Sequence, residues 1–143
     1  MRKLIAAAAL ACLLPVAAWA QSVADMDKSL DALFGGHKPY ADFFAKLQTA
    51  VASGDKATVA GLIDYPFQAR IGDKAVKIKD AAHFTSDYDK VITAKVKAAV
   101  AKQTYATLFA NWQGVMIGDG EIWFSGVGKD ANHMAVKITA IND

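Results

Sequence analysis

The residues that best suggest a binding site are aromatic. They lie on stretches that alternate between apolar and polar residues, as β-strands do. The set comprises Tyr65, Phe67, Trp112, Met116, Trp123 and Phe124. Arg70, Asn111 and the two indole N–H groups place hydrogen-bonding groups beside these apolar surfaces. Such a mixture is typical of small-molecule sites, so we hypothesise a binding pocket, with ordinary core packing as the alternative. Its site residues would be Tyr65, Arg70, Asn111, Trp112, Met116 and Trp123.

Arg70 is the only arginine after residue 2, and it lies on a predicted strand among the aromatic residues. A guanidinium group can hold a carboxylate through two parallel hydrogen bonds. We therefore expect Arg70 to bind an acidic group of a ligand. Simple exposure to solvent on a strand is the alternative, and it is the commoner position for arginine.

Residue spacings of a catalytic or metal site are not found in the sequence. The three histidines share no metal-ligand spacing, and no serine lies in a G-x-S-x-G motif. Asp119 and Glu121 flank Gly120 in a predicted turn. An exposed turn does not provide the burial that adapts a carboxylate to general acid–base catalysis. We therefore expect no catalytic residue, no metal and no cofactor.

The N-terminus has the three-part pattern of a secretory signal peptide. A basic start, Met1-Arg2-Lys3, is followed by an apolar run from Leu4 to Val16 and by Ala18-Trp19-Ala20. We expect residues 1–20 to be removed and the protein to be periplasmic or secreted. The remaining residues, 21–143, suit one domain, since the chain of 143 residues is 54% hydrophobic and 21% charged.

Removal of Arg2 and Lys3 would leave 14 basic residues against 14 acidic ones. A neutral chain is not a basic-patch nucleic-acid binder, so we expect no nucleic-acid partner. The only cysteine, Cys12, lies in the expected signal segment, and lipid attachment there is an alternative to cleavage after Ala20. No later stretch approaches the ~18 apolar residues of a membrane helix, so we expect no membrane contact after signal removal.

Apolar spacing predicts helices in the first half of the mature chain. One helix is expected from Ser22 to Phe34, ended by Gly35-Gly36. The strongest helical spacing starts at Pro39 and stops at Ser53-Gly54. Asp55 is expected to cap a shorter helix.

Alternation then predicts strands on either side of one more helical region. A hairpin is expected from about Phe67 to Ile78, around Gly72-Asp73. A helix should start after Asp80, with a break near Thr93. A second hairpin, with Asp119-Gly120 as its turn, joins Val115–Gly118 to Glu121–Val127. A final strand is expected from Met134 to Ala140. The predicted fold class is α+β, with N-terminal helices packed on a curved antiparallel sheet.

This order of elements, together with Tyr65-Pro66-Phe67 and the stretch LFANWQGVMIGDGEIWF from Leu108 to Phe124, resembles small exported bacterial proteins of the nuclear-transport-factor-two-like (SnoaL-like) superfamily. The resemblance spans about Pro39 to Ile141. It implies a cone-like arrangement in which sheet and helices enclose a pocket that different members use for catalysis, ligand binding or association. Enzymes of the superfamily often carry an Asp, His or Tyr base in the cone, whereas the positions expected to face inward here are apolar apart from Tyr65, Arg70 and Trp123.

Three functions remain open from the sequence. The first is an exported non-catalytic domain that binds a small apolar or amphipathic ligand. The second is a protein-interaction module, either an inhibitor or a subunit that forms a homodimer through its sheet face. The third is a small hydrolase, isomerase or dehydratase. An interior filled by aromatic side chains would leave only the outer sheet face for function, whereas a solvent-open pocket with a buried carboxylate would favour an enzyme.

Overall fold

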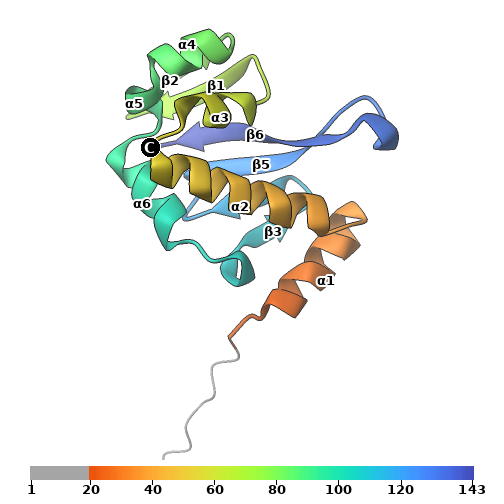
Figure 1. The fold of residues 1–143 in the computed structure, drawn as a ribbon. Coiled ribbons are helices and arrows are strands. Elements are labelled where there is room, and N and C mark those ends of the chain that lie inside the picture. The colour runs from red at the N-terminus through yellow and green to blue at the C-terminus, as the bar shows by residue number, and fades with distance from the viewer. Residues whose placement is uncertain (1–19) are drawn as a thin grey trace, which may run out of the picture.

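Helices cover one face of a six-stranded sheet in the computed structural model, which describes residues 20–143 (Figure 1). The strand order is β2-β1-β6-β5-β4-β3. The α+β class and the packing of helices on a sheet are therefore confirmed. The expected signal segment lies outside the described residues, apart from Ala20.

The first three helices begin within one residue of the expected positions, and the first two also end where expected, whereas the third ends before Leu62 and Ile63, which were expected on it. In α1 (Val23–Phe34), Ser22 and Asp25 form a capping box, and Gly35 ends the helix at a φ of 77°. Helix α2 (Lys38–Ser53) has Pro39 in its first turn and ends at Gly54, whose φ is 68°. Helix α3 (Lys56–Gly61) is capped by the side chain of Asp55.

The helical region after Asp80 is divided into three short helices. They are α4 (Ala81–Ser86), α5 (Tyr88–Val91) and α6 (Ala94–Lys102). The expected break near Thr93 is confirmed, because its hydroxyl accepts a hydrogen bond from the Val96 N–H and starts α6. The break at Asp87 was not predicted.

Both predicted hairpins and the final strand are present, and one further strand was missed. The strands are β1 (Phe67–Ile71), β2 (Lys74–Ile78), β3 (Phe109–Asn111), β4 (Gly114–Ile117), β5 (Ile122–Val127) and β6 (Ala135–Asn142). Single 3-10 turns, η1 (Tyr105–Thr107) and η2 (Ala131–His133), precede β3 and β6.

The sheet is mixed, whereas the sequence led us to expect antiparallel pairing throughout. Strands β1 and β6 run parallel, with Ala69 beside Ile141 and Arg70 beside Asn142. The other strand pairs are antiparallel. Alternation along a strand shows which side chains share a face, but it does not show which strand will be the neighbour or in which direction that strand runs.

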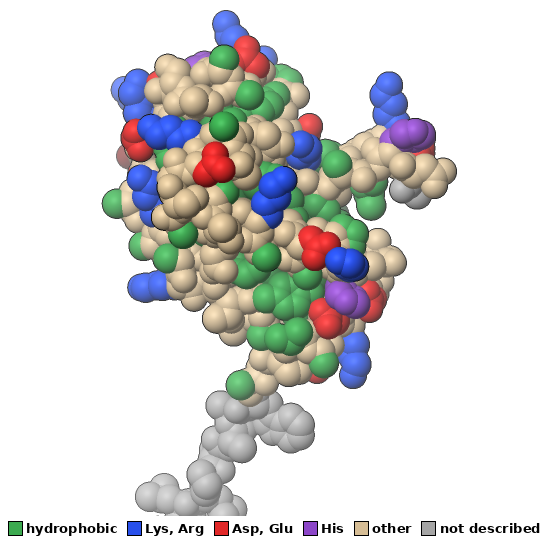
Figure 2. All heavy atoms as spheres, in the orientation of Figure 1, with side chains coloured by type: hydrophobic (Ala, Val, Ile, Leu, Met, Phe, Trp, Pro, Cys, Tyr) green, Lys and Arg blue, Asp and Glu red, His purple; other side chains and the backbone are tan. Residues whose placement is uncertain are grey.

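Apolar side chains fill the space between the helices and the sheet. Leu47 of α2 and Phe124 of β5 are fully buried, and the Phe43 ring lies 4.9 Å from the Phe124 ring. Ile138 of β6 is equally buried in the same core. The interior that the resemblance implied as a pocket is thus occupied by a packed core. On the helix side of the surface, charged side chains of both signs are interspersed (Figure 2).

Candidate functional site

The sheet face turned away from the helices carries a row of apolar side chains. In β5, Ile122 and Phe124 are buried in the core, so Trp123 between them points to the opposite face. Trp123 pairs with Met116 on one side and with Ala140 on the other. The expectation that Trp123 faces the concave, helix-covered side of the sheet is wrong.

Phe109 extends this row to the edge strand. It pairs with Met116, and its ring meets the Trp123 indole edge to face, with the ring centroids 6.3 Å apart. Half of Phe109 is exposed, and Trp112 in the next turn is 81% exposed. We call the apolar surface of Phe109, Met116, Trp123 and Ala140 the outer sheet face; Trp112 lies in the turn that ends the β3–β4 pair.

A hollow of about 470 Å³ lies beside the indole at one end of this row. Met116 and Trp123 form an apolar part of its wall, while Arg70 and Asn142 approach from the parallel strands β1 and β6. Its other lining residues are Lys95, Asp119, Gly120, Glu121 and Asp143. We call it the Trp123 hollow. Its volume is in the range of about 300 to 1,000 Å³ that is usual for small-molecule sites.

Glu121 is a functional candidate that the sequence reasoning missed. Its side chain is only 8% exposed, whereas we expected an exposed turn. The Asp119 N–H donates a 2.6 Å hydrogen bond to Glu121 Oε2 and folds the carboxylate back under the turn. The turn is held from the other side by Asn142, whose Nδ2 donates to the Gly120 carbonyl at 2.7 Å. The sequence contains one signal for this turn, the glycines on either side of Asp119. Gly118 and Gly120 both adopt a positive φ, which glycine tolerates best.

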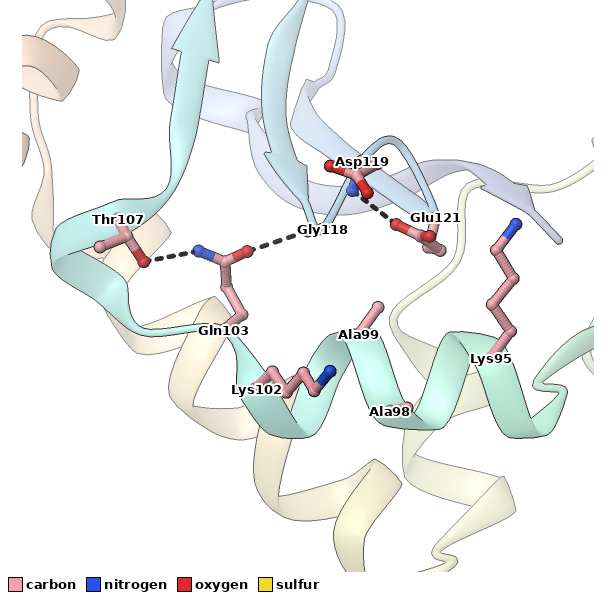
Figure 3. A pocket seen from close by; sticks show the side chains of 9 residues that line it. All are labelled: Lys95, Ala98, Ala99, Lys102, Gln103, Thr107, Gly118, Asp119 and Glu121. Atoms are coloured by element: carbon pink, nitrogen blue, oxygen red, sulfur yellow. Dashed lines mark hydrogen bonds between the residues drawn. The ribbon is translucent and has the colours of Figure 1, made fainter.

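A second hollow, of about 410 Å³, lies between α6 and the same turn (Figure 3). Gln103 spans it, because its Nε2 donates to Thr107 Oγ1 while its Oε1 accepts from the Gly118 N–H at 2.9 Å. Lys95, Asp119 and Glu121 line both hollows. The Glu121 carboxylate is therefore part of the wall between them.

The structure brings together three of the six predicted site residues, namely Arg70, Met116 and Trp123. Tyr65 lies elsewhere: its hydroxyl donates to the Ala60 carbonyl at 2.9 Å, and burial raises the pKa of Tyr65 to about 12. Asn111 accepts a hydrogen bond from the Gln113 N–H and shapes the β3–β4 turn. Trp112, in that turn, projects into solvent.

The histidines lie near element ends and have local carboxylate partners. His37 Nδ1 is 2.8 Å from Asp31 Oδ1, and His133 Nδ1 is 2.8 Å from Asp130 Oδ1. Within residues 20–143 no group of three or more potential metal ligands is present. Over the same range, no helix has the length and apolar character needed to span a membrane.

Comparison with known proteins found no matching family model, no matching curated protein and no matching solved structure.

Proposed function

We propose that this chain is an exported, non-catalytic binding domain that holds a small amphipathic ligand in the Trp123 hollow. The observation that carries the proposal is the pairing of an indole surface with an uncommitted guanidinium in one hollow. Trp123 is partly exposed there, and Met116 extends its apolar surface. Among the described residues, Arg70 takes part in no ion pair.

These two groups suit two parts of one ligand. An apolar part would gain from contact with the indole, since aromatic side chains offer large apolar areas in fixed geometry. An acidic part would gain charge-assisted hydrogen bonds from Arg70. The order of helices and strands supports the further proposal of a nuclear-transport-factor-two-like fold, with the ligand on the outer sheet face because the interior is packed.

Binding without catalysis is favoured by the surroundings of Glu121. A buried carboxylate would favour an enzyme, and Glu121 is such a residue. Its Oε2, however, already accepts a hydrogen bond from the Asp119 N–H. Acid–base or nucleophilic catalysis usually needs a second reactive group within hydrogen-bond reach. The other acid–base side chains that line the Trp123 hollow, Lys95, Asp119 and Asp143, form no side-chain hydrogen bond or ion pair with Glu121 in the described chain.

Titration with 8-anilinonaphthalene-1-sulfonate, an amphipathic anion whose fluorescence rises on apolar surfaces, tests the proposal. We expect saturable binding that Trp123→Ala abolishes. Trp112→Ala is the matched control and should leave binding intact, because Trp112 lies in the exposed turn. Arg70→Met should weaken binding by roughly 1 to 3 kcal/mol through loss of a charged hydrogen bond. Equal loss in both tryptophan variants, or full binding by Trp123→Ala, would refute the site; circular dichroism confirms that each variant is folded.

The exposed aromatic residues favour a second candidate function, a homodimer formed through the outer sheet face. Trp112 is 81% exposed and Phe109 is 50% exposed, and the cross-strand neighbour of Phe109 is the uncharged Met116. An isologous interface sets a patch against itself, so an uncharged patch avoids repulsion between like charges. Sedimentation should show a dimer that Trp112→Ala dissociates and that Leu33→Ala, an exposed apolar residue of α1, does not. A concentration-independent monomer would exclude this function.

A further inference from the structure

The Trp123 hollow presents charges of both signs around its apolar wall. Arg70 and Lys95 supply positive charge, and the carboxylates of Asp119, Glu121 and Asp143 supply negative charge; Glu121 as a residue is only 8% exposed. We propose that the ligand is a zwitterion: a small apolar body that carries both an ammonium and a carboxylate group, as a free α-amino acid does. This inference rests on the proposed function, because it assigns the ligand class of the same hollow.

Arg70 is the group that would receive the carboxylate. It lies on β1 next to Asn142 of β6, so its side chain starts from the rim of the hollow and is exposed to solvent. No described carboxylate forms an ion pair with it, although Asp143 lines the same hollow. A planar guanidinium with unused donors matches both oxygens of a carboxylate.

Glu121 is the group that would receive the ammonium. One of its oxygens accepts the Asp119 N–H, and no described residue donates a hydrogen bond to the other. Lys95 extends from α6 alongside the turn, as Figure 3 shows, yet it forms no ion pair with Glu121. The second oxygen is not among the fully buried polar atoms that lack a partner in the described chain, so it stays accessible although Glu121 as a whole is only 8% exposed. An ammonium group in the hollow would supply the missing donors.

The Trp123 indole lines the hollow together with these charged groups. It offers a contact surface to the apolar body of the ligand. Trp123 is flanked by Met116, and a Cβ on Gly120 would lie 3.7 Å from the indole nitrogen. Gly120, with a φ of 117°, thus keeps the turn backbone close to the ring. The indole face can also attract the ammonium, since cations bind over aromatic rings. A ligand with one charge would satisfy only Arg70 or only Glu121.

Three probes with the same aromatic ring separate these contributions: phenylalanine as zwitterion, phenethylamine as cation and 3-phenylpropanoate as anion. Affinities are measured from the chemical shifts of the mature protein. We expect phenylalanine to bind about tenfold or more tightly than either singly charged probe, since each charged hydrogen bond contributes at least about one factor of ten.

Two variants assign the charges. Glu121→Gln should weaken phenylalanine and phenethylamine about tenfold and leave 3-phenylpropanoate unchanged. Arg70→Met should weaken phenylalanine and 3-phenylpropanoate and leave phenethylamine unchanged. Because the unaffected probe reports an intact hollow, a loss that is specific to one charge cannot come from misfolding.

The outcomes distinguish this inference from the proposed function. Equal affinity for all three probes, or phenylalanine binding that Glu121→Gln leaves unchanged, would overturn the zwitterion while an aromatic ligand site survived. Loss of all three probes in Glu121→Gln would also overturn it, because Glu121 would then serve the turn alone. If neither these probes nor 8-anilinonaphthalene-1-sulfonate perturbs Trp123, the proposed function itself fails.

Discussion

Glu121 Oε2 accepts a 2.6 Å hydrogen bond from the backbone N–H of Asp119, and this bond closes the turn between β4 and β5. The carboxylate lies directly against Gly118, so a Cβ there would force the Glu121 side chain out of this position. Because Glu121 lines the hollows on both sides of the turn, the geometry of this turn also sets the shape of the proposed site.

Gly118→Ala should therefore destabilise the protein and weaken ligand binding. A Cβ at this position would overlap the Glu121 carboxylate and the Ala99 side chain, and the φ of 65° is unfavourable for alanine. We expect a loss of more than about 1 kcal/mol in the free energy of unfolding, measured with urea.

Gly72→Ala is the matched control for that variant. Gly72 also has a positive φ, 57°, but a Cβ there would meet no atom within 4 Å. Both variants share the backbone strain, so the difference between them reports the contact with Glu121. Equal losses in the two variants would contradict the role given to Glu121.

Leu47→Ala tests the packing of α2 on the sheet. Leu47 is fully buried in the core that also contains Ile138, and we expect the substitution to lower the free energy of unfolding by about 2 to 5 kcal/mol. Lys46→Ala, on the exposed side of the same turn, should change it by less than about 0.5 kcal/mol. A loss for Leu47→Ala as small as that for Lys46→Ala would place this helix face in solvent.

The pair formed by His37 and Asp31 predicts a pH dependence of stability. The hydrogen bond that the His37 imidazolium donates to the Asp31 carboxylate raises the pKa of His37 above its usual 6.5 and lowers the pKa of Asp31 below 3.8. The stabilisation from His37 is complete below pH 6.5 and is lost as the pH rises through the raised pKa. That from Asp31 is present above pH 3.8 and is lost as the pH falls through the lowered pKa.

Thermal unfolding across pH measures this effect. Between about pH 6 and about pH 9, the wild-type Tm should fall more than the Tm of His37→Gln. Asp31→Asn should flatten the wild-type curve in the same way, because it removes the partner of the imidazole. The groups facing His37 are Asp27 and Asp31 of α1 and Lys38 of α2. Parallel wild-type and His37→Gln curves would show that the pair contributes nothing.

Processing of the N-terminus is tested by intact mass. Cleavage after Ala20 predicts an exported protein that begins at Gln21 and contains no cysteine. A species that begins at Cys12 and carries lipid would show that the lipoprotein alternative is correct.

Local signals account for most of what could be predicted from the sequence. Pro39 and Gly54 bound α2 because a proline fits the first turn of a helix and a glycine fits the left-handed position after it. Gly72 marks the β1–β2 turn for the same conformational reason. Strand β3, with three residues, is too short for alternation to reveal it.

The site was harder to predict because it depends on contacts between distant segments. Arg70 meets Asn142 only through the parallel pairing of β1 with β6, and no local pattern encodes that pairing. Glu121 is buried because its carboxylate folds back against its own turn, where it accepts the Asp119 N–H and lies beside Gly118. The face on which Trp123 lies could have been predicted from the sequence. Its neighbours Ile122 and Phe124 are more apolar, and alternation along a strand puts Trp123 on the face opposite to theirs.

The indole N–H resonances of Trp112 and Trp123 give the most direct test of ligand binding in the Trp123 hollow. These are the two tryptophans of residues 21–143, and Trp112→Phe assigns their signals. On titration with 8-anilinonaphthalene-1-sulfonate, the Trp123 signal should shift saturably while the Trp112 signal stays in place. A Trp123 signal that does not move, or a larger shift at Trp112, would contradict the proposal.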